Sequence, residues 1–306
     1  MDRIEAVTMS TPPYISSTSR TLRPGRFYGQ VLRKHIGDGI ILTELKHEQP
    51  RRLPTHSHEL AFFHLLLYGH YSETFEHRTA TLKPLTTIFH PSGVTHHDEI
   101  GPAGMRIFSV ELHNEWLDRL REIGVAPQSS VALPGSELSR LAMRLYREYL
   151  NLDRCSVLVI EGLVLEMLAL VSRPERVPER RPPMWLSKVE DLLKNGFQEN
   201  ITIAEVAAQV SVNPAHLSRV FRQFHNQAIS DYLHDLRVEF ACQQLADPDV
   251  ALSAIASASG FSDQSHFTRV FKHCTGMTPG AFRAMVLNNP HTHKGSESVS
   301  CEIELS

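Results

Sequence analysis

The chain has 306 residues, of which 42% are hydrophobic and 21% are charged, and its formal net charge is −3. These values are ordinary for a globular protein, and the length predicts about two domains. The balanced charge gives no overall signal for nucleic acid or for an anionic membrane. Any site for such a partner must therefore be a local feature of the chain.

The cysteines and the apolar runs argue against a disulfide-rich or zinc-knuckle protein and against a membrane protein. The four cysteines form no C-x-x-C pair, which is typical of a reducing compartment rather than a disulfide framework or a zinc knuckle. The first residues carry Asp2 and Glu5 without an apolar run, unlike a signal peptide. The most apolar stretch, 156–171, is too short for a membrane span and contains Glu161 and Glu166. We therefore expect a cytoplasmic protein without a membrane segment.

The first part of the chain has β character. Residues 1–25 are rich in Ser, Thr and Pro and predict a flexible tail. Residues 26–112 contain short apolar runs separated by Gly, Pro or polar residues, which predict an all-β barrel or sandwich. In residues 113–172 the apolar spacing changes to three and four, which predicts helices. The expected helices lie near 115–124, 137–150 and 156–171.

The second part of the chain is predicted to be all helical. Residues 173–183 (RPERVPERRPP) combine proline with charge and predict a linker. Residues 184–289 then contain short helices, and residues 290–306 predict a second flexible tail. The expected helices lie near 184–196, 202–209, 213–225, 229–246, 252–259, 262–274 and 278–288.

Capping signals mark where several of these helices begin. Thr202 and Glu205 have the spacing of a capping box. Asn213-Pro214 and Thr278-Pro279 each place a capping residue before a proline at the first helical position. Ser262 is a further candidate N-cap. The helix starts are therefore predicted more sharply than those of the strands.

One helical design occurs twice, at an offset of 50 residues. The repeated apolar residues have the spacing i, i+3, i+4, i+7 of one helix face: Leu217, Val220, Phe221 and Phe224 in the first copy, and Phe267, Val270, Phe271 and Cys274 in the second. Arg219 and Arg222, like Arg269 and Lys272, point away from this stripe. A short capped helix, a tight turn and a second helix with a basic front predict two helix-turn-helix units, about 202–225 and 252–274.

A helix of about 18 residues, near 229–246, joins the two units and would span ~27 Å. Successive major-groove faces on one side of B-DNA are ~34 Å apart. One chain is therefore predicted to read two adjacent major-groove segments of double-stranded DNA.

Motif residues make the prediction more specific. The second unit contains Gly260-Phe261-Ser262-Asp263 and ends with Gly276 and Thr278-Pro279, and the first contains His216-Leu217-Ser218-Arg219. With these residues, the segment 184–287 resembles the DNA-binding domain of the AraC/XylS family of bacterial transcription regulators. The resemblance implies promoter DNA as a partner, and RNA polymerase if the protein is an activator. It implies base contacts from Ala215, His216, Arg219, Gln264, Ser265 and Arg269, and backbone contacts from Arg222 and Lys272.

The segment departs from the family pattern in three ways. Ser211 stands where the first turn often has glycine, and residues 225–230 lack the Gly-x-Ser-Pro that usually follows the first recognition helix. Between residues 184 and 290 there are eight Lys or Arg against ten Asp or Glu. Specific DNA-binding domains are typically basic, so we expect weak non-specific affinity for DNA.

The β region carries a histidine pattern. His56, His58, Phe62 and His64 share one face of a predicted strand, with Leu60 between them. Residues 91–96 (PSGVTH) resemble the second cupin motif, and regulators of this family commonly carry a cupin-like barrel before the DNA-binding part. The predicted fold is therefore α+β and multidomain: an N-terminal cupin-like β-barrel with following helices, then an all-α double helix-turn-helix. The candidate pocket residues are His56, His58, Phe62, His64 and His96.

Two states of this barrel remain open. His56, His58 and His96 have the chemistry to hold zinc or iron, with His64 or His97 as a fourth ligand. Metal cupins, however, place a glutamate four or five residues after the H-x-H, where this chain has Phe62 and Phe63. We therefore favour a metal-free barrel that needs no cofactor and binds a small ligand.

The leading hypothesis is a transcription regulator controlled by a small molecule of unknown identity, with activator and repressor both open. The resemblance implies a homodimer formed through the helices of 137–171. The alternative is a metal-dependent cupin enzyme with an appended DNA-binding domain. The chain has no G-x-S-x-G, Walker A or paired Cys/His motif, so we expect no enzymatic activity.

Overall fold

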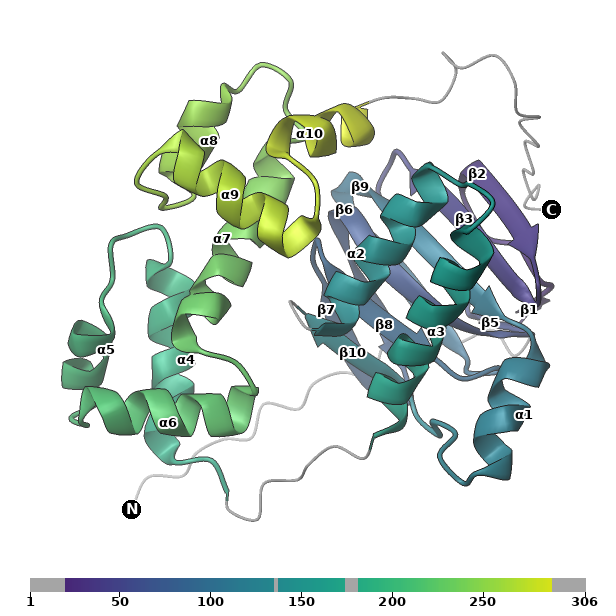
Figure 1. Ribbon diagram of the computed structural model, residues 1–306, viewed down its shortest axis with the longest axis horizontal. Helices are drawn as coiled ribbons and strands as arrows, with labels where there is room; N and C mark the ends of the chain where they lie inside the picture. Colours follow the sequence, from purple (N-terminus) through teal and green to yellow (C-terminus); the bar gives the residue numbers. More distant parts are fainter. Residues whose placement is uncertain (1–19, 135–136, 174–180, 288–306) are drawn as a thin grey trace, which may run out of the picture.

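The computed structural model describes residues 20–134, 137–173 and 181–287 (Figure 1). Within these residues, ten strands form one sheet, and ten helices follow or cover it. The strands are β1 (Arg20–Leu22), β2 (Gln30–Gly37), β3 (Ile40–His47), β4 (Arg51–Arg52), β5 (His56–His58), β6 (Ala61–Phe75), β7 (Arg78–Leu82), β8 (Thr86–His90), β9 (His96–Leu112) and β10 (Val131–Pro134). The helices are α1 (Asn114–Glu122), α2 (Glu137–Leu150), α3 (Ser156–Ser172), α4 (Met184–Gly196), α5 (Ile203–Gln209), α6 (Pro214–His225), α7 (Ile229–Gln244), α8 (Leu252–Ala258), α9 (Gln264–Thr275) and α10 (Pro279–Leu287).

Two long antiparallel strands, β6 and β9, organise the sheet. They pair from Ala61–Leu112 to Phe75–His96, and their register shifts twice, between Leu66 and Tyr68 and between Gly69 and Tyr71. Such irregularities bend a strand pair, which helps the sheet curve into a barrel. Gly69 has φ +83°, and a Cβ there would lie 2.0 Å from the carbonyl oxygen of Gly104, so this bend requires glycine.

The predicted boundaries of the barrel are too narrow. Within the predicted tail 1–25, β1 pairs with β5 in parallel, and Leu22 is buried. Within the predicted helical region 113–172, β10 pairs with β8. Both strands are short and depend on distant partners, which sequence periodicity does not reveal. The rest of the first tail, most of the linker 173–183 and the tail 290–306 lie outside the described residues.

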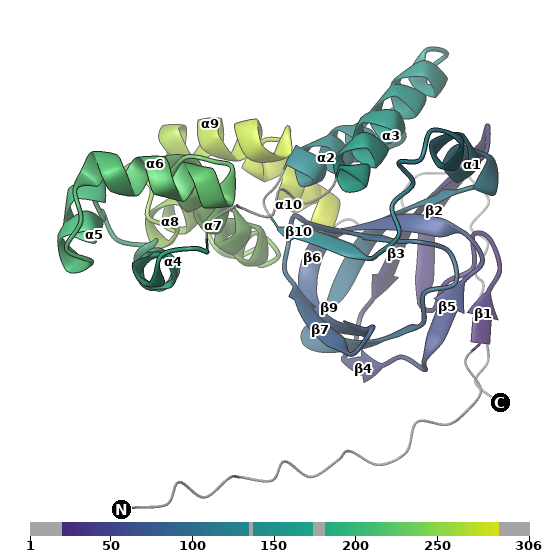
Figure 2. The same ribbon diagram turned by 90° about the horizontal axis from the view of Figure 1, so that it is seen from below.

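The two helices after the barrel form a layer on the sheet. In Figures 1 and 2, α2 and α3 lie across one face of the barrel and α1 lies at its end. The buried residues Leu138, Leu145 and Leu168 belong to the same apolar core as Phe63 and Phe108 of the strands. Burial on both faces explains why the first half of β6 is a continuous apolar run rather than an alternating one.

The helical half has two cores. Leu186, Val206, Leu217 and Phe221 form a separate core that belongs to α4, α5, α6 and the start of α7. The buried residues of α8, α9 and α10, by contrast, join the core of α2 and the barrel. The second unit is thus packed against the N-terminal half, whereas the first is stabilised by its own core. None of the helices within the described ranges is long and apolar enough to cross a membrane.

Candidate functional sites

The helices α6 and α9 present the predicted DNA-contacting residues. All eight side chains are exposed: Ala215, His216, Arg219, Arg222, Gln264, Ser265, Arg269 and Lys272. The opposite stripe of each helix is buried, with Leu217 and Phe221 in α6 and Phe267 and Phe271 in α9 all at 0% exposure. Each helix therefore has an apolar back and a basic front, as the repeat predicts.

The first turn of each of these helices is fixed by a side-chain cap. Asn213 accepts a hydrogen bond from the Ala215 backbone N–H at 2.9 Å, and Pro214 follows as predicted. In the second unit Asp263 is the cap, accepting from the His266 N–H at 2.7 Å. The prediction of Ser262 as N-cap is therefore wrong: its hydroxyl donates instead to the Asp263 carboxylate at 3.1 Å.

In the first unit, two turn residues adopt the left-handed backbone conformation that glycine adopts at the equivalent positions of the second unit. Ser211 lies at φ 55°, and Asn226 ends α6 in the left-handed region at φ 55°. In the second unit, Gly260 and Gly276 occupy the equivalent places at φ 80° and 72°. Asparagine tolerates this conformation better than most residues, whereas serine at Ser211 carries strain.

The connecting helix sets the distance between the two units. With 16 residues, α7 spans about 24 Å, slightly less than the sequence predicted. In Figure 1, α7 runs between α6 and α9, and Figure 2 shows α6 and α9 on the same side of the helical half. This arrangement offers two exposed basic helices to one face of a duplex.

Inside the barrel, the structure brings all five predicted pocket residues together. His56 and His58 come from β5, Phe62 and His64 from β6, and His96 from β9, and all are buried. Neighbouring rings lie close, with centroids 4.3 Å apart for His56 and His96 and 4.5 Å apart for His58 and Phe62. The residues thus fill the barrel interior with packed rings.

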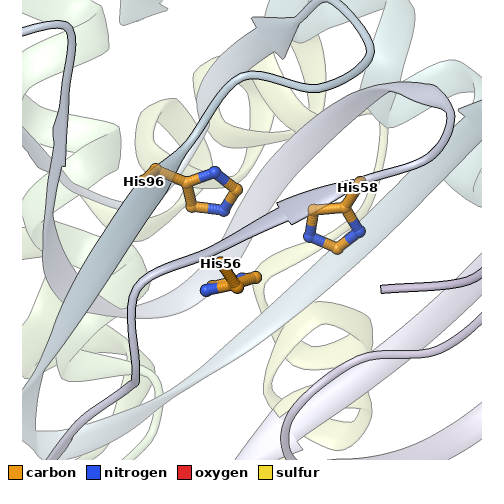
Figure 3. A group of neighbouring side chains, drawn as sticks. All are labelled: His56, His58 and His96. Carbon is orange, nitrogen blue, oxygen red and sulfur yellow. The ribbon is translucent and has the colours of Figure 1, made fainter. Parts of the chain in front are cut away.

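Three of the imidazoles converge on one point (Figure 3). His56, His58 and His96 each offer a ring nitrogen, and these atoms lie within 4.8 Å of one another. The predicted fourth ligands are not part of this group. His97 faces Arg52 at 3.4 Å on the half-exposed side of β9, and the ring of His64 is 6.2 Å from that of His58.

Sequence reasoning missed a buried carboxylate beside these rings. Glu73, on β6, is 1% exposed, and its Oε1 lies 2.8 Å from His90 Nε2 and 3.8 Å from His96 Nε2. Its Oε2 accepts a hydrogen bond from the Tyr71 hydroxyl at 3.3 Å. The signal was present in the sequence, because Glu73 alternates with inward-facing Tyr71 and Phe75 at a period of two.

Burial decides the protonation of this cluster. Desolvation, then the neighbouring charge of His96, lowers the pKa of His56 to about 3, and burial also lowers the pKa values of His58 and His96. Burial therefore favours the neutral form of each of these imidazoles. Burial by itself would raise the pKa of Glu73, but His90 and His96 outweigh it and lower that pKa. Burial, and then the Glu73 charge, raise the pKa of Asp98 well above its usual value.

A buried polar network links the barrel to the last helix. Arg106, on β9, donates to Glu44 at 2.7 Å and to the carbonyl oxygens of Met285 and Val286 at the end of α10. Tyr146 of α2 also donates to Glu44, at 2.6 Å. A cation among the last carbonyls of a helix satisfies groups that the helix leaves unpaired. Barrel, α2 and second helix-turn-helix unit therefore meet at Arg106.

Among the described residues, two open cavities lie away from the histidine cluster. One, of about 270 Å³, lies between the β2–β3 hairpin and the start of α3, beside His35, Leu42 and Val157. The other, of about 400 Å³, lies between α2, α3 and Met277, next to Arg144 and Arg147. The structure thus offers places for a small molecule outside the packed histidine cluster.

Comparison with known proteins agrees with both halves of the structure. Residues 39–168 match the family model of an AraC-like ligand-binding domain, and residues 206–285 match a helix-turn-helix domain. The chain is 32% identical over 135 residues to the arabinose operon regulatory protein of Escherichia coli, covering 40% of this chain and 46% of that protein. It is 24% identical over 105 residues to the Msm operon regulatory protein of Streptococcus mutans, covering 34% and 38%.

These alignments span less than half the length of the curated relatives. Among solved structures, a variant of ToxT from Vibrio cholerae aligns with 82% of this chain and 98% of its own, at 11% identity and a TM-score of 0.38. The C-terminal domain of AraT from Geobacillus stearothermophilus aligns with 38% of this chain and 97% of its own, at 23% identity and a TM-score of 0.34. The two domain matches together cover about two thirds of the sequence and occur in the order expected from it. In both of these regions the chain is similar to regulators of the AraC/XylS type.

Proposed function

We propose that this protein is a sequence-specific transcription regulator whose two helix-turn-helix units read adjacent major-groove segments of promoter DNA. The observation that carries the proposal is the pair of exposed basic faces on α6 and α9, each backed by a buried apolar stripe. Arg219 and Arg269 are suited to guanine because a guanidinium can bond its O6 and N7 together. Arg222 and Lys272, one turn later, are suited to phosphates.

A small ligand bound to the N-terminal half is proposed to control this activity. The second unit shares its core with α2 and the barrel, and Arg106 joins them directly. A ligand that binds one arrangement of the two halves better than another would shift their equilibrium, and with it the affinity for DNA. RNA polymerase would be a further partner if the regulator is an activator.

The proposed dimer contact is the outer face of α3. This face carries exposed apolar side chains: Val157, Leu158, Val159 and Leu165, which are 38–70% exposed. Gly162 lies between them, and a Cβ placed there would meet no atom within 4 Å. A helix face of this kind allows close packing of a second copy. Replacing Leu158 and Leu165 together with lysine should convert a dimer, measured by light scattering, into a monomer; a monomeric wild type at micromolar concentration would contradict the proposal.

The alternative, a metal-dependent enzyme with an appended DNA-binding domain, gains one feature from the structure, the buried Glu73. The family match of the barrel is nevertheless to a ligand-binding domain. A non-enzymatic regulator therefore remains the proposed function.

The test is selection of bound DNA from a random duplex library, with the wild type and Arg269→Ala in parallel. The expected result is a motif of two elements about one helical turn apart, altered only in one element by the substitution. No enrichment, with and without added metabolite pools, would contradict sequence-specific binding. An unchanged motif for Arg269→Ala would remove this residue from the base-reading set.

A further inference from the structure

We propose that His56, His58 and His96 form a binding site for a divalent first-row transition metal ion inside the barrel, with Glu73 as its acidic neighbour. The proposal concerns the barrel alone and does not depend on DNA binding.

Hydrogen bonds already orient two of the rings as metal ligands are oriented. His56 Nδ1 lies 2.8 Å from the Pro54 carbonyl oxygen, and His96 Nδ1 lies 3.2 Å from that of Val94. Each Nδ1 therefore carries the proton that it donates, and each Nε2 is left with a free lone pair. A ligating histidine usually donates its other ring N–H to a backbone carbonyl or a carboxylate in this way.

The third ring, that of His58, has a buried nitrogen without a partner among the described residues. His58 is only 1% exposed, so water does not reach its ring. Its Nδ1 has no hydrogen-bond partner among the described residues. A buried polar atom without a partner is destabilising, so such atoms require an explanation. A metal ion bound by this ring would supply the missing interaction.

The size of the space selects an ion over an organic molecule. The rings of His56, His58, Phe62 and His96 lie 4.3–5.9 Å apart by centroid, which leaves no gap for a sugar or an aromatic ring among them. The three ligand nitrogens lie within 4.8 Å of one another. Two atoms bound to one ion at about 2.0–2.1 Å can be no more than about 4.2 Å apart. Small rotations of the rings would bring the three nitrogens within this distance.

The donor set identifies the class of ion. Neutral imidazoles suit Zn²⁺, Fe²⁺ and similar ions, whereas Ca²⁺ and Mg²⁺ take oxygen ligands and Cu⁺ takes thiolates. The described cysteines lie on or beside α3, α7 and α9, away from β5 and β9. Among the described residues the site is therefore rich in nitrogen and without a thiolate, and three protein ligands leave a fourth position for water or another small ligand.

Glu73 makes a charged ion acceptable in this interior. A doubly charged ion held by three neutral rings would bring its whole charge into a buried environment, at a large cost. The carboxylate of Glu73, whose Oε1 lies 3.8 Å from His96 Nε2 and whose Oε2 accepts a hydrogen bond from Tyr71, can offset part of that charge. Glu73 would thus replace the glutamate that metal cupins place after the H-x-H motif. It lies near the end of β6, whereas the usual position of that glutamate is at the start of this strand.

The experiment uses the full chain without a polyhistidine tag. Chelator-treated protein is titrated with Co²⁺, whose visible absorption reports its coordination, and metal content is measured after dialysis against Zn²⁺. The wild type is expected to bind one equivalent. His58→Gln, which removes a ligand at similar volume, should weaken binding at least about a hundredfold, and Glu73→Gln by about 10–100-fold.

The matched control is His97→Gln, on the same strand as His96 but directed at Arg52 on the other side. It should bind Co²⁺ like the wild type. Equal affinity in wild type and His58→Gln would overturn the proposal, as would no bound metal in the wild type. X-ray absorption spectroscopy of the Zn²⁺-loaded wild type counts the imidazole ligands and needs no substitution. A spectrum without imidazole ligands would also overturn the proposal. Metal binding without DNA binding would contradict the proposed function and leave this site standing.

Discussion

Arg219 and Arg269 occupy equivalent places on α6 and α9, and both are exposed. Arg219 is partly ordered by its neighbour, since its guanidinium lies 3.1 Å from His216 Nδ1. Such a contact reduces the freedom that the side chain must lose when it meets a base. Arginine reads guanine through a rigid fork of donors, which lysine lacks.

We predict that Arg219→Lys and Arg269→Lys each lose ~1–3 kcal/mol of discrimination at one base position, while affinity for random DNA is almost unchanged. Lys272→Ala should instead weaken binding to all DNA sequences alike. It should also reduce the slope of log K against log salt concentration by about one. Binding titrations at several salt concentrations separate the two effects. Lys194→Ala is the control, because Lys194 lies on α4 and contacts Glu190 at 3.7 Å. If Arg→Lys left base preference intact, direct readout would be the wrong mechanism.

A second residue, Asp235 of α7, makes stability depend on pH at the contact with α2. Burial raises its pKa to about 7, only partly opposed by Arg140 of α2, while Asp231 and Glu239 raise it further. Its Oδ2 has no hydrogen-bond partner among the described residues. Because the folded pKa exceeds the unfolded one, the contribution of Asp235 is fully present below about pH 4 and is lost as pH rises through 7.

Asp235→Asn should therefore raise the free energy of unfolding at pH 8 by on the order of 1–3 kcal/mol relative to the wild type, and change it little at pH 4. Denaturant titrations of both proteins across this range make the comparison. A difference between the two proteins that stays constant from pH 4 to pH 8 would rule out titration of Asp235 as its cause.

At the scale of elements, the two turns show the same backbone built with different residues. Ser211 and Gly260 both have positive φ, at 55° and 80°. A Cβ at Gly260 would lie 2.7 Å from the Phe197 carbonyl oxygen, so this position excludes any larger residue. At Ser211 the Cβ is tolerated, and the cost is backbone strain of about 1–2 kcal/mol.

Ser211→Gly should stabilise the first unit by up to ~1 kcal/mol, because relief of strain is partly offset by the greater freedom of glycine in the unfolded chain. The reverse change, Gly260→Ser, should destabilise the protein by more than 1 kcal/mol, since strain and the backbone clash add. Thermal unfolding of both variants provides the measurement. Loss of stability in Ser211→Gly would mean that the serine hydroxyl has a role that outweighs the strain.

The same elements show which features a sequence can predict. The helices of both units were predicted within two residues because their signals are local: the Thr202–Glu205 box, the Asn213 cap and an apolar stripe. β1 and β10 escaped prediction because their strand partners are distant in sequence. Glu73 also lies on a local period of two with Tyr71 and Phe75, but its closeness to His90 and His96 depends on β8 and β9, which no local pattern places beside it. The histidine face was predicted because it lies on a local period of two.

At the scale of the whole molecule, the division of the cores does not follow the division of the sequence. The proline-rich linker precedes both helix-turn-helix units, yet α8, α9 and α10 share a core with α2 and the barrel. Lys83 of the barrel also pairs with Glu239 of α7 at 3.0 Å. A ligand that rearranges the barrel would therefore act first on the second unit, while the first unit follows through α7.

Two matched substitutions test this division. Val206 and Val238 are both 0% exposed, but Val206 belongs to the core of the first unit and Val238 to the shared core. Replacing either with alanine should cost about 2 kcal/mol. Val206→Ala should lower the exchange protection of backbone amides only in α4, α5 and α6, whereas Val238→Ala should lower it in α8–α10 and in α2 together. Hydrogen-exchange mass spectrometry resolves these segments. If Val238→Ala affected the helical half alone, the two halves would be separate cooperative units, and a signal from the barrel would have to reach DNA by another route than the shared core.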